Sequence, residues 1–211
     1  KQKLIPVVDK ENTLIGVVSR GDLLRVLHEG VEQQVEPSKV SFQGRAGVEK
    51  NLKSLVKERL DKDVFKHLES IAQIGDRLNL SIYAVGGFVR DLLLNIPNQD
   101  IDIVVEGDGI AFAACLAEEL GGRVTSHEKF GTSVVIFSDD YRIDVATARM
   151  EYYKHPGALP TVEKSSVKSD LFRRDFTVNC MAVKLTGINA FCLIDFFNGE
   201  RDLRSKEIHV L

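Results

Sequence analysis

A pair of glycines at the end of a short apolar run constrains this chain more than any other feature. Residues 82–85 are apolar and partly β-branched, which predicts a buried strand. Gly86 and Gly87 follow, and residues without a Cβ permit a tight turn and a close approach of the backbone to a ligand. Residues 88–94 are predicted to form a helix directly after this turn. The first amides of such a helix suit a bound anion.

Two aspartates follow at a spacing that suits a metal ion. Residues 95–98 interrupt the helix, and the run 99–105 predicts the next strand. Because side chains alternate along a strand, Asp100 and Asp102 share one face. Mg²⁺ takes one or two carboxylates together with water and phosphate oxygens. A glycine pair alone is usually a turn and Asp-x-Asp alone is usually a solvated strand end, but their ordered combination predicts chemistry on a nucleoside triphosphate.

This combination resembles the head domain of class II tRNA nucleotidyltransferases and of the bacterial poly(A) polymerases similar to them. The signature of that family is Gly-Gly-x-Val-Arg-Asp, a short loop and Asp-x-Asp, which residues 86–91 and 100–102 match. The resemblance spans roughly residues 65–211, and the segments that continue it in order are 142–149, 151–162, 169–179 and 195–203. Two positions depart from the family pattern, since Asn95 and Asn198 stand where the family commonly has Gly.

The resemblance implies a template-independent nucleotidyltransferase that acts on RNA 3′ ends. Such an enzyme adds AMP, CMP or the sequence CCA from ATP or CTP to a tRNA 3′ end and releases pyrophosphate. It uses two Mg²⁺ ions, for which Asp100 and Asp102 are the expected shared ligands. Asp144 is the expected third catalytic carboxylate, because alternation along 142–146 permits it to face the metals. The alternative for Asp144 is a surface acid or a member of a salt bridge.

The nucleotide-binding residues that the resemblance implies come from the glycine turn with its helix and from the Arg-Arg-Asp-Phe-Thr motif. They are Gly86, Gly87, Arg90, Asp91, Arg173, Arg174, Asp175 and Asn179. The glycines would contact the triphosphate through backbone amides, and Arg174 with Asp175 would select the ribose. A structural ion pair is the alternative for Arg90 and Asp91. Adjacent arginines on one helix point in different directions, so the two of this motif are not expected to serve one phosphate.

Residues 1–30 resemble the C-terminal half of a CBS domain. The predicted elements of this part are two strands and a helix, at residues 4–8, 14–18 and 21–28. In that family the Ser/Thr-x-x-Asp residues, here Ser19 and Asp22, contact the ribose of a bound adenine nucleotide. The alternative is that Ser19 only caps the helix and Asp22 only favours its positive end. Self-association through CBS domains is a further expectation.

The rest of the chain is expected to be one α/β (α+β) domain behind a linker. The predicted divisions are a polar linker at 31–47, a connecting helix at 48–62 and the head domain at 63–211. Within the head domain a helix is predicted at 110–120, and strands are predicted at 123–126, 133–137, 142–146, 181–185 and 191–195. The expected fold is a nucleotidyltransferase-fold mixed sheet with helices on one side. We expect a piece of a longer protein, whose neck and body follow the head domain.

Composition sets the remaining limits. With 44% hydrophobic and 28% charged residues, the chain is typical of a globular protein. Its net charge of −3 and pI near 6.0 lower the expectation of tight RNA binding by this piece alone, because dedicated nucleic-acid binders are typically basic. No run approaches the ~20 apolar residues of a membrane span. Cys115, Cys180 and Cys192 lack zinc spacing, so buried thiols and a cytoplasmic location are expected.

Three other functions stay open at this point. The first is a regulatory module in which the CBS part senses an adenine nucleotide, and the second is a poly(A) polymerase that acts on general RNA. The third is a small-molecule nucleotidyltransferase, against which the motif at 173–177 argues. The added base is not assigned, because in the family the residues that hydrogen-bond to the base lie beyond the head domain.

Overall fold

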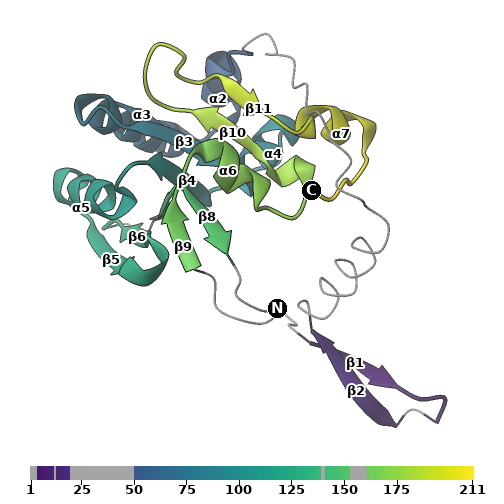
Figure 1. Ribbon diagram of the computed structural model, residues 1–211. Helices are drawn as coiled ribbons and strands as arrows, with labels where there is room; N and C mark the ends of the chain where they lie inside the picture. The colour runs from purple at the N-terminus through teal and green to yellow at the C-terminus, as the bar shows by residue number, and fades with distance from the viewer. Residues whose placement is uncertain (1–3, 12, 20–49, 139–140, 153–160) are drawn as a thin grey trace. The chain divides into compact units, whose positions relative to one another are not determined.

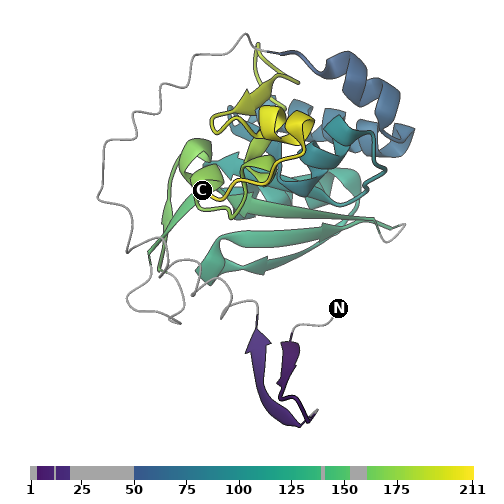
Figure 2. The ribbon, with the colours of Figure 1, turned by 90° about the vertical axis from the view of Figure 1, so that its right-hand side faces the viewer.

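The structure is a computed structural model that describes residues 4–11, 13–19, 50–138, 141–152 and 161–211. The chain divides into two compact units, Lys1–Gln43 and Gly44–Leu211. Figures 1 and 2 show the ribbon from two directions 90° apart. Among the helices in these described ranges, none is long and apolar enough to span a membrane.

The first unit contains an antiparallel hairpin. Strands β1 (Leu4–Val8) and β2 (Leu14–Ser19) pair at the positions predicted from the sequence. The Asp9 carboxylate closes the turn, because it accepts hydrogen bonds from the amides of Glu11 and Thr13 at 3.0 and 2.8 Å. The predicted helix at 21–28, Asp22, the linker and the side chain of Ser19 lie outside the described residues.

A seven-stranded mixed sheet organises the second unit. Its strands are β3 (Ser81–Val85), β4 (Ile101–Glu106), β5 (Arg123–His127), β6 (Thr132–Ile136), β7 (Arg142–Thr147), β10 (Met181–Lys184) and β11 (Leu193–Asp195). They follow the order β11-β10-β3-β4-β7-β6-β5, in which only β4 and β7 run parallel to each other. Strands β8 (Arg149–Tyr152) and β9 (Thr161–Lys164) form a separate antiparallel pair.

Four helices cover one face of this sheet. They are α2 (Lys53–Arg59), α3 (Lys62–Arg77), α4 (Gly87–Leu94) and α5 (Gly109–Leu120), and their apolar side chains form the main core with alternate residues of the strands. Helix α3 contributes the buried side chains of Leu68, Ile71 and Ile74 at helical spacing. The expected fold class, a mixed α/β sheet with helices packed on it, is confirmed.

The expectation that the helices lie on one side of the sheet is wrong for one helix, because the opposite face carries a second, smaller core. Helix α6 (Val167–Phe172) packs there, with Leu171 against Tyr83 of β3 and Val104 of β4 in one buried cluster. Figure 1 shows α6 in front of β3 and β4, with α4 behind them. The remaining elements are the short helices η1 (Glu128–Phe130) and η2 (Thr177–Asn179) and helix α7 (Gly199–Ser205).

The helix predicted within residues 48–62 begins later than expected. Asn51 lies in a β-bridge to the segment before β11, and the Leu52 amide donates to the Phe191 carbonyl at 2.7 Å. Asn51 is therefore paired as in a strand, and α2 starts only at Lys53. Leu52 and Val56 are buried in the main core, so α2 is part of the second unit.

The two departures from the family pattern fall at left-handed backbone positions. Asn95 follows α4 with φ of 58°, and Asn198 precedes α7 with φ of 61°. Glycine adopts this conformation without steric cost, and asparagine tolerates it better than most other side chains. Exchange of Gly for Asn therefore keeps both turns.

Replacement of Asn95 tests this explanation. We expect Asn95→Ala to lower the free energy of unfolding by roughly 1 kcal/mol, because a Cβ without a compensating polar group is strained at positive φ. Asn95→Gly should leave it equal or higher. Thermal unfolding of both variants checks the order, and a less stable Asn95→Gly would contradict the account.

Candidate nucleotide and metal site

The parallel pair β4–β7 brings two of the predicted carboxylates together. Asp102 and Asp144 are directly opposite in the strand register. Their apolar neighbours Ile101, Ile103 and Ile143 are buried under the helices, so alternation directs both aspartates to the opposite face of the sheet. Burial raises the pKa of Asp102 above its ordinary value, the guanidinium of Arg174 opposes this shift, and the nearby carboxylates of Asp144 and Asp100 add to it.

Asp144 has a carboxylate oxygen that needs a partner. Its Oδ2 accepts from Arg142 Nη2 at 3.3 Å. Its Oδ1 is buried and has no hydrogen-bond partner among the described residues. A buried carboxylate oxygen without a donor is costly, and a cation beside Asp102 would remove that cost. The alternative of a simple salt-bridged acid accounts for only one of the two oxygens.

Asp100 is less closely held than the other two. It lies just before β4 with an exposed side chain, and its amide donates to Asn98 Oδ1 at 2.8 Å. The Asp100, Asp102 and Asp144 side chains do not gather tightly enough to place three ligand atoms within 4.8 Å of one another; in the described ranges only Asp202, Glu207 and His209 do so. Asp102 and Asp144 thus share one face of the sheet, but the three carboxylates do not converge into a tight group.

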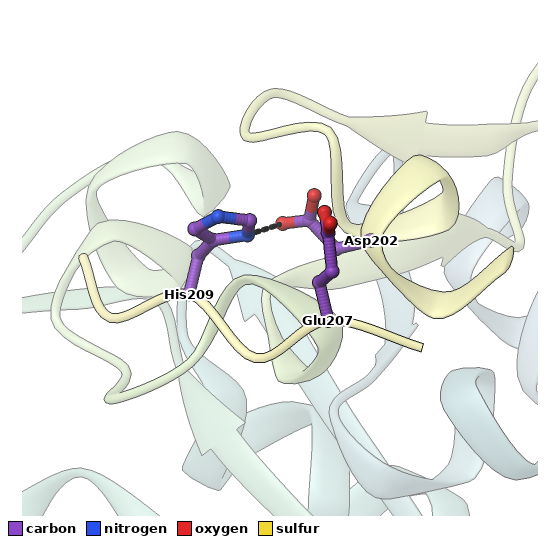
Figure 3. A group of neighbouring side chains, drawn as sticks. All are labelled: Asp202, Glu207 and His209. Atoms are coloured by element: carbon purple, nitrogen blue, oxygen red, sulfur yellow. Dashed lines mark ion pairs between the residues drawn. The ribbon is translucent and has the colours of Figure 1, made fainter. Parts of the chain in front are cut away.

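The tighter group near the C-terminus is satisfied by protein partners. Figure 3 shows His209 and Glu207 beside Asp202 of α7. Asp202 Oδ2 accepts from Thr177 Oγ1 at 2.6 Å and lies 3.1 Å from His209 Nδ1. The Thr177 amide also donates to the His209 carbonyl at 3.0 Å. These bonds attach the last residues of the chain to η2, which accounts for the group without an ion.

Gly86 lies where β3, Asp102 and Arg174 meet. Its φ is 70°, and a Cβ added there would lie 2.8 Å from Arg174 Nη1 and 3.6 Å from Asp102 Oδ2. A glycine is therefore needed for the close approach. The Gly86 amide donates to the Met181 carbonyl at 3.3 Å, so it is already bonded within the protein. Gly87 is the first residue of α4, and the first amides of a helix have no partner within that helix.

Arg90 and Asp91 form an ion pair that continues to two asparagines. Arg90 Nε donates to Asp91 Oδ1 at 2.8 Å, and Arg90 Nη1 donates to Asn179 Oδ1 at 2.7 Å. Asn98 Nδ2 donates to the other Asp91 oxygen at 2.8 Å. The network connects α4 to η2 and to the loop before Asp100. The sequence indicates only a helix break at Asn98, because Asp91, to which its side chain donates, lies seven residues earlier.

Arg173 and Arg174 are held by the same carboxylate, that of Asp170. Arg173 Nε and Nη2 donate to Asp170 Oδ1 at 3.1 and 2.8 Å, and Arg174 Nη2 donates to Asp170 Oδ2 at 3.2 Å. Asp170 lies three residues before Arg173 and four before Arg174, and residues at both of these spacings are neighbours on a helix surface. Asp170 is fully buried and was not singled out from the sequence. Asp175 follows the two arginines and is half-buried.

The cysteines carry none of this site. Cys180 and Cys192 are buried and Cys115 is partly buried, and all three are free thiols. Burial raises the pKa of Cys180 to about 12, so its thiol stays protonated. The expectation of buried thiols is confirmed for two of the three.

Comparison with known proteins agrees with this geometry. The model of the poly A polymerase head domain family matches residues 82–209, and the CBS domain model matches residues 2–29. An A-adding tRNA nucleotidyltransferase of Geobacter sulfurreducens is 47% identical over all of this chain and 24% of its own length. One of Aquifex aeolicus is 40% identical over all of this chain and 23% of its own length.

A solved structure is similar in fold as well as in sequence. The CCA-adding enzyme of Thermotoga maritima, complexed with tRNA, superposes with a TM-score of 0.68 at 42% identity over 77% of this chain and 36% of that one. The chain thus spans about a quarter of the length of the two A-adding relatives. The carboxylate set on β4 and β7 fits the divalent metal that the nucleotidyltransferase family implies, since oxygen ligands suit hard cations.

Substitution of Asp102 should stabilise the protein without metal. The pKa of Asp102 is raised in the folded state, so its ionised form opposes folding above that pKa, and this cost disappears as the pH falls toward the ordinary carboxyl value of about 4. We expect Asp102→Asn to raise the melting temperature at pH 7.5 in EDTA, and by less at pH 5. An equal or lower melting temperature at pH 7.5 would contradict the account.

Gly86→Ala and Gly121→Ala form a matched pair. Both glycines have φ near 70°, but a Cβ at Gly121 meets nothing within 4 Å, whereas at Gly86 it meets the Arg174 guanidinium. We expect both variants to lose stability, roughly 1 kcal/mol from the backbone alone. Only Gly86→Ala should also weaken binding of Mg²⁺-ATP, by about 10-fold or more in calorimetry. Equal affinities in the two variants would show that Gly86 lies outside the site.

Proposed function

The chain belongs to the poly A polymerase head domain family, and from this premise we propose that it is the catalytic part of an enzyme that adds AMP to the 3′ end of tRNA. The observation that carries the proposal is the pairing of Asp102 with Asp144 beside Gly86 and Arg174. The two relatives that match over its whole length both carry the name A-adding tRNA nucleotidyltransferase, which favours AMP over CMP or CCA.

In this proposal two Mg²⁺ ions are held by Asp100 and Asp102, with Asp144 as the third carboxylate. When bound, the ions make the RNA 3′-hydroxyl easier to deprotonate and stabilise the attacking and leaving oxygens of an in-line displacement. The protein contributes position and charge. The β4 and β7 backbones fix Asp102 and Asp144 side by side, and the main core under Ile101 and Ile143 keeps both strands rigid.

The nucleotide is proposed to lie between α4 and the end of α6. Gly87 would offer its amide and Arg90 its guanidinium to the triphosphate, while Asp91 and Asn179 hold that guanidinium in place. Arg174 would contact phosphate or ribose through Nη1, which lies next to Gly86. Asp175 would accept a hydrogen bond from the ribose hydroxyl.

The rest of the protein's function is proposed from the same premise. Residues 1–30 would be half of a CBS domain, 31–47 a linker and 63–211 the head domain, with a CBS-mediated contact between copies. Ser19 and Asp22 would contact an adenine nucleotide there. The RNA substrate would be tRNA, as in the complex of the Thermotoga relative, and the protein would act in the cytoplasm.

The test uses the full-length protein that contains this chain. We expect it to incorporate labelled AMP from ATP into tRNA that ends before A76, with little CMP incorporation into tRNAs that end before C74 or C75. Asp102→Ala and Asp144→Ala should each lower the rate by about 1,000-fold or more, because each removes charge stabilisation at the reacting phosphate.

Asp63→Asn is the matched control, since Asp63 is an exposed acid of α3 paired only with Lys66 nearby. It should retain the wild-type rate. Efficient extension of unrelated RNA would favour a general poly(A) polymerase instead. Adenine nucleotide binding that is lost in Asp22→Ala but kept in Asp102→Ala, together with no transfer, would favour the regulatory alternative.

A further inference from the structure

A buried carboxylate lies behind the two arginines of the nucleotide site. Asp170 is fully buried, with 0% exposure, in the middle of α6. A buried carboxylate is tolerated only when it is paired and hydrogen-bonded. Three guanidinium donors satisfy it, two from Arg173 and one from Arg174. The paired arginine side chains are about a quarter exposed, at 24% and 22%.

This arrangement leaves one terminal nitrogen of Arg174, Nη1, beside the Gly86 turn. Its Nη2 is taken by Asp170, its Nε has no partner among the described residues, and its Nη1 lies against Gly86. The Asp102 carboxylate is close enough for the positive charge of Arg174 to oppose the rise in its pKa that burial causes. A guanidinium is a rigid planar fork, so fixing one nitrogen orients the other two.

Helix α6 is itself attached to the sheet. The Val167 amide at its start donates to Glu106 Oε1 at 2.7 Å, and the Tyr83 hydroxyl donates to Glu106 Oε2 at 3.1 Å. Glu106 is the last residue of β4, the strand that carries Asp102 near its start. Asp170 is thus fixed relative to β3 and β4 by the start of its helix and by the packing of Leu171.

From these contacts we propose that Asp170 is a positioning residue that acts through Arg173 and Arg174, so that the nucleotide meets guanidiniums already in place. The proposal rests on the proposed function and assigns Asp170 no contact with the substrate. Its role is to remove the cost of ordering two long side chains at the moment of binding.

The direction of the change in ATP affinity distinguishes a positioning role of Asp170 from a simple effect of its charge. ATP is strongly anionic, so removing a negative charge near its site would tighten binding if only net charge mattered. Positioning predicts the reverse, because an amide at residue 170 cannot hold both guanidiniums. We expect Asp170→Asn to weaken binding of Mg²⁺-ATP to the full-length protein by about 10- to 100-fold, the scale of a lost charge-assisted hydrogen-bond pair.

A double-mutant cycle tests whether Asp170 affects ATP binding through Arg174. In the Arg174→Ala background, Asp170→Asn should cost clearly less affinity for Mg²⁺-ATP than it does in the wild type, because one of the two guanidiniums that Asp170 orients is absent. The preference for ATP over 2′-deoxyATP should also fall in Asp170→Asn if the arginine that it holds reads the ribose. A merely structural role would lower the melting temperature and leave this preference unchanged.

Asp202→Asn is the control for loss of a buried acid, since Asp202 is also buried and hydrogen-bonded but contacts Thr177 and His209 instead. It should lower the melting temperature while the affinity for Mg²⁺-ATP stays within about twofold. Tighter ATP binding by Asp170→Asn, or equal losses with and without Arg174, would overturn the proposal. Failure of the wild-type protein to transfer AMP while these affinities behave as expected would instead overturn the proposed reaction.

Discussion

The strand register between β4 and β7 is the constraint on which the rest of the site depends. Apolar side chains at alternate positions must face the helices, so Asp102 and Asp144 must face away from them. Parallel pairing then sets the two aspartates opposite each other. A shift of either strand by one residue would turn its own aspartate under the helices and its isoleucine away from them. The core therefore positions the charged pair as a consequence of its own packing.

The positive side of the site is built differently, from buried polar contacts. Asp170 holds Arg173 and Arg174 at the end of α6, and Asp91 and Asn179 hold Arg90 on α4. Gly86 lies beside Arg174 and Asp102 and has a φ of 70°, which favours a residue without a side chain. Like charges on Asp102 and Asp144 remain partly uncompensated, which is the condition in which a divalent cation binds most favourably.

Local periodicity made much of this predictable. Alternation in 99–105 and 142–146 gave the shared face of Asp102 and Asp144, and the glycine pair gave the turn before α4. What could not be read was set by contacts distant in sequence or by helix ends. Asp170 could not be singled out, because nothing local shows that its side chain is buried and bonded to Arg173 and Arg174. Likewise, the Met181 carbonyl accepts from the Gly86 amide only because β10, which is distant in sequence, pairs with β3.

The most direct test is a crystal structure of the full-length protein soaked with Mn²⁺ and a non-hydrolysable ATP analogue, analysed by anomalous scattering. The account predicts Mn²⁺ peaks at coordination distance from carboxylate oxygens of Asp102 and Asp100 or Asp144, with the analogue's phosphates on the same ions. Peaks confined to Asp202, Glu207 and His209, or an analogue bound away from Gly86, would contradict it.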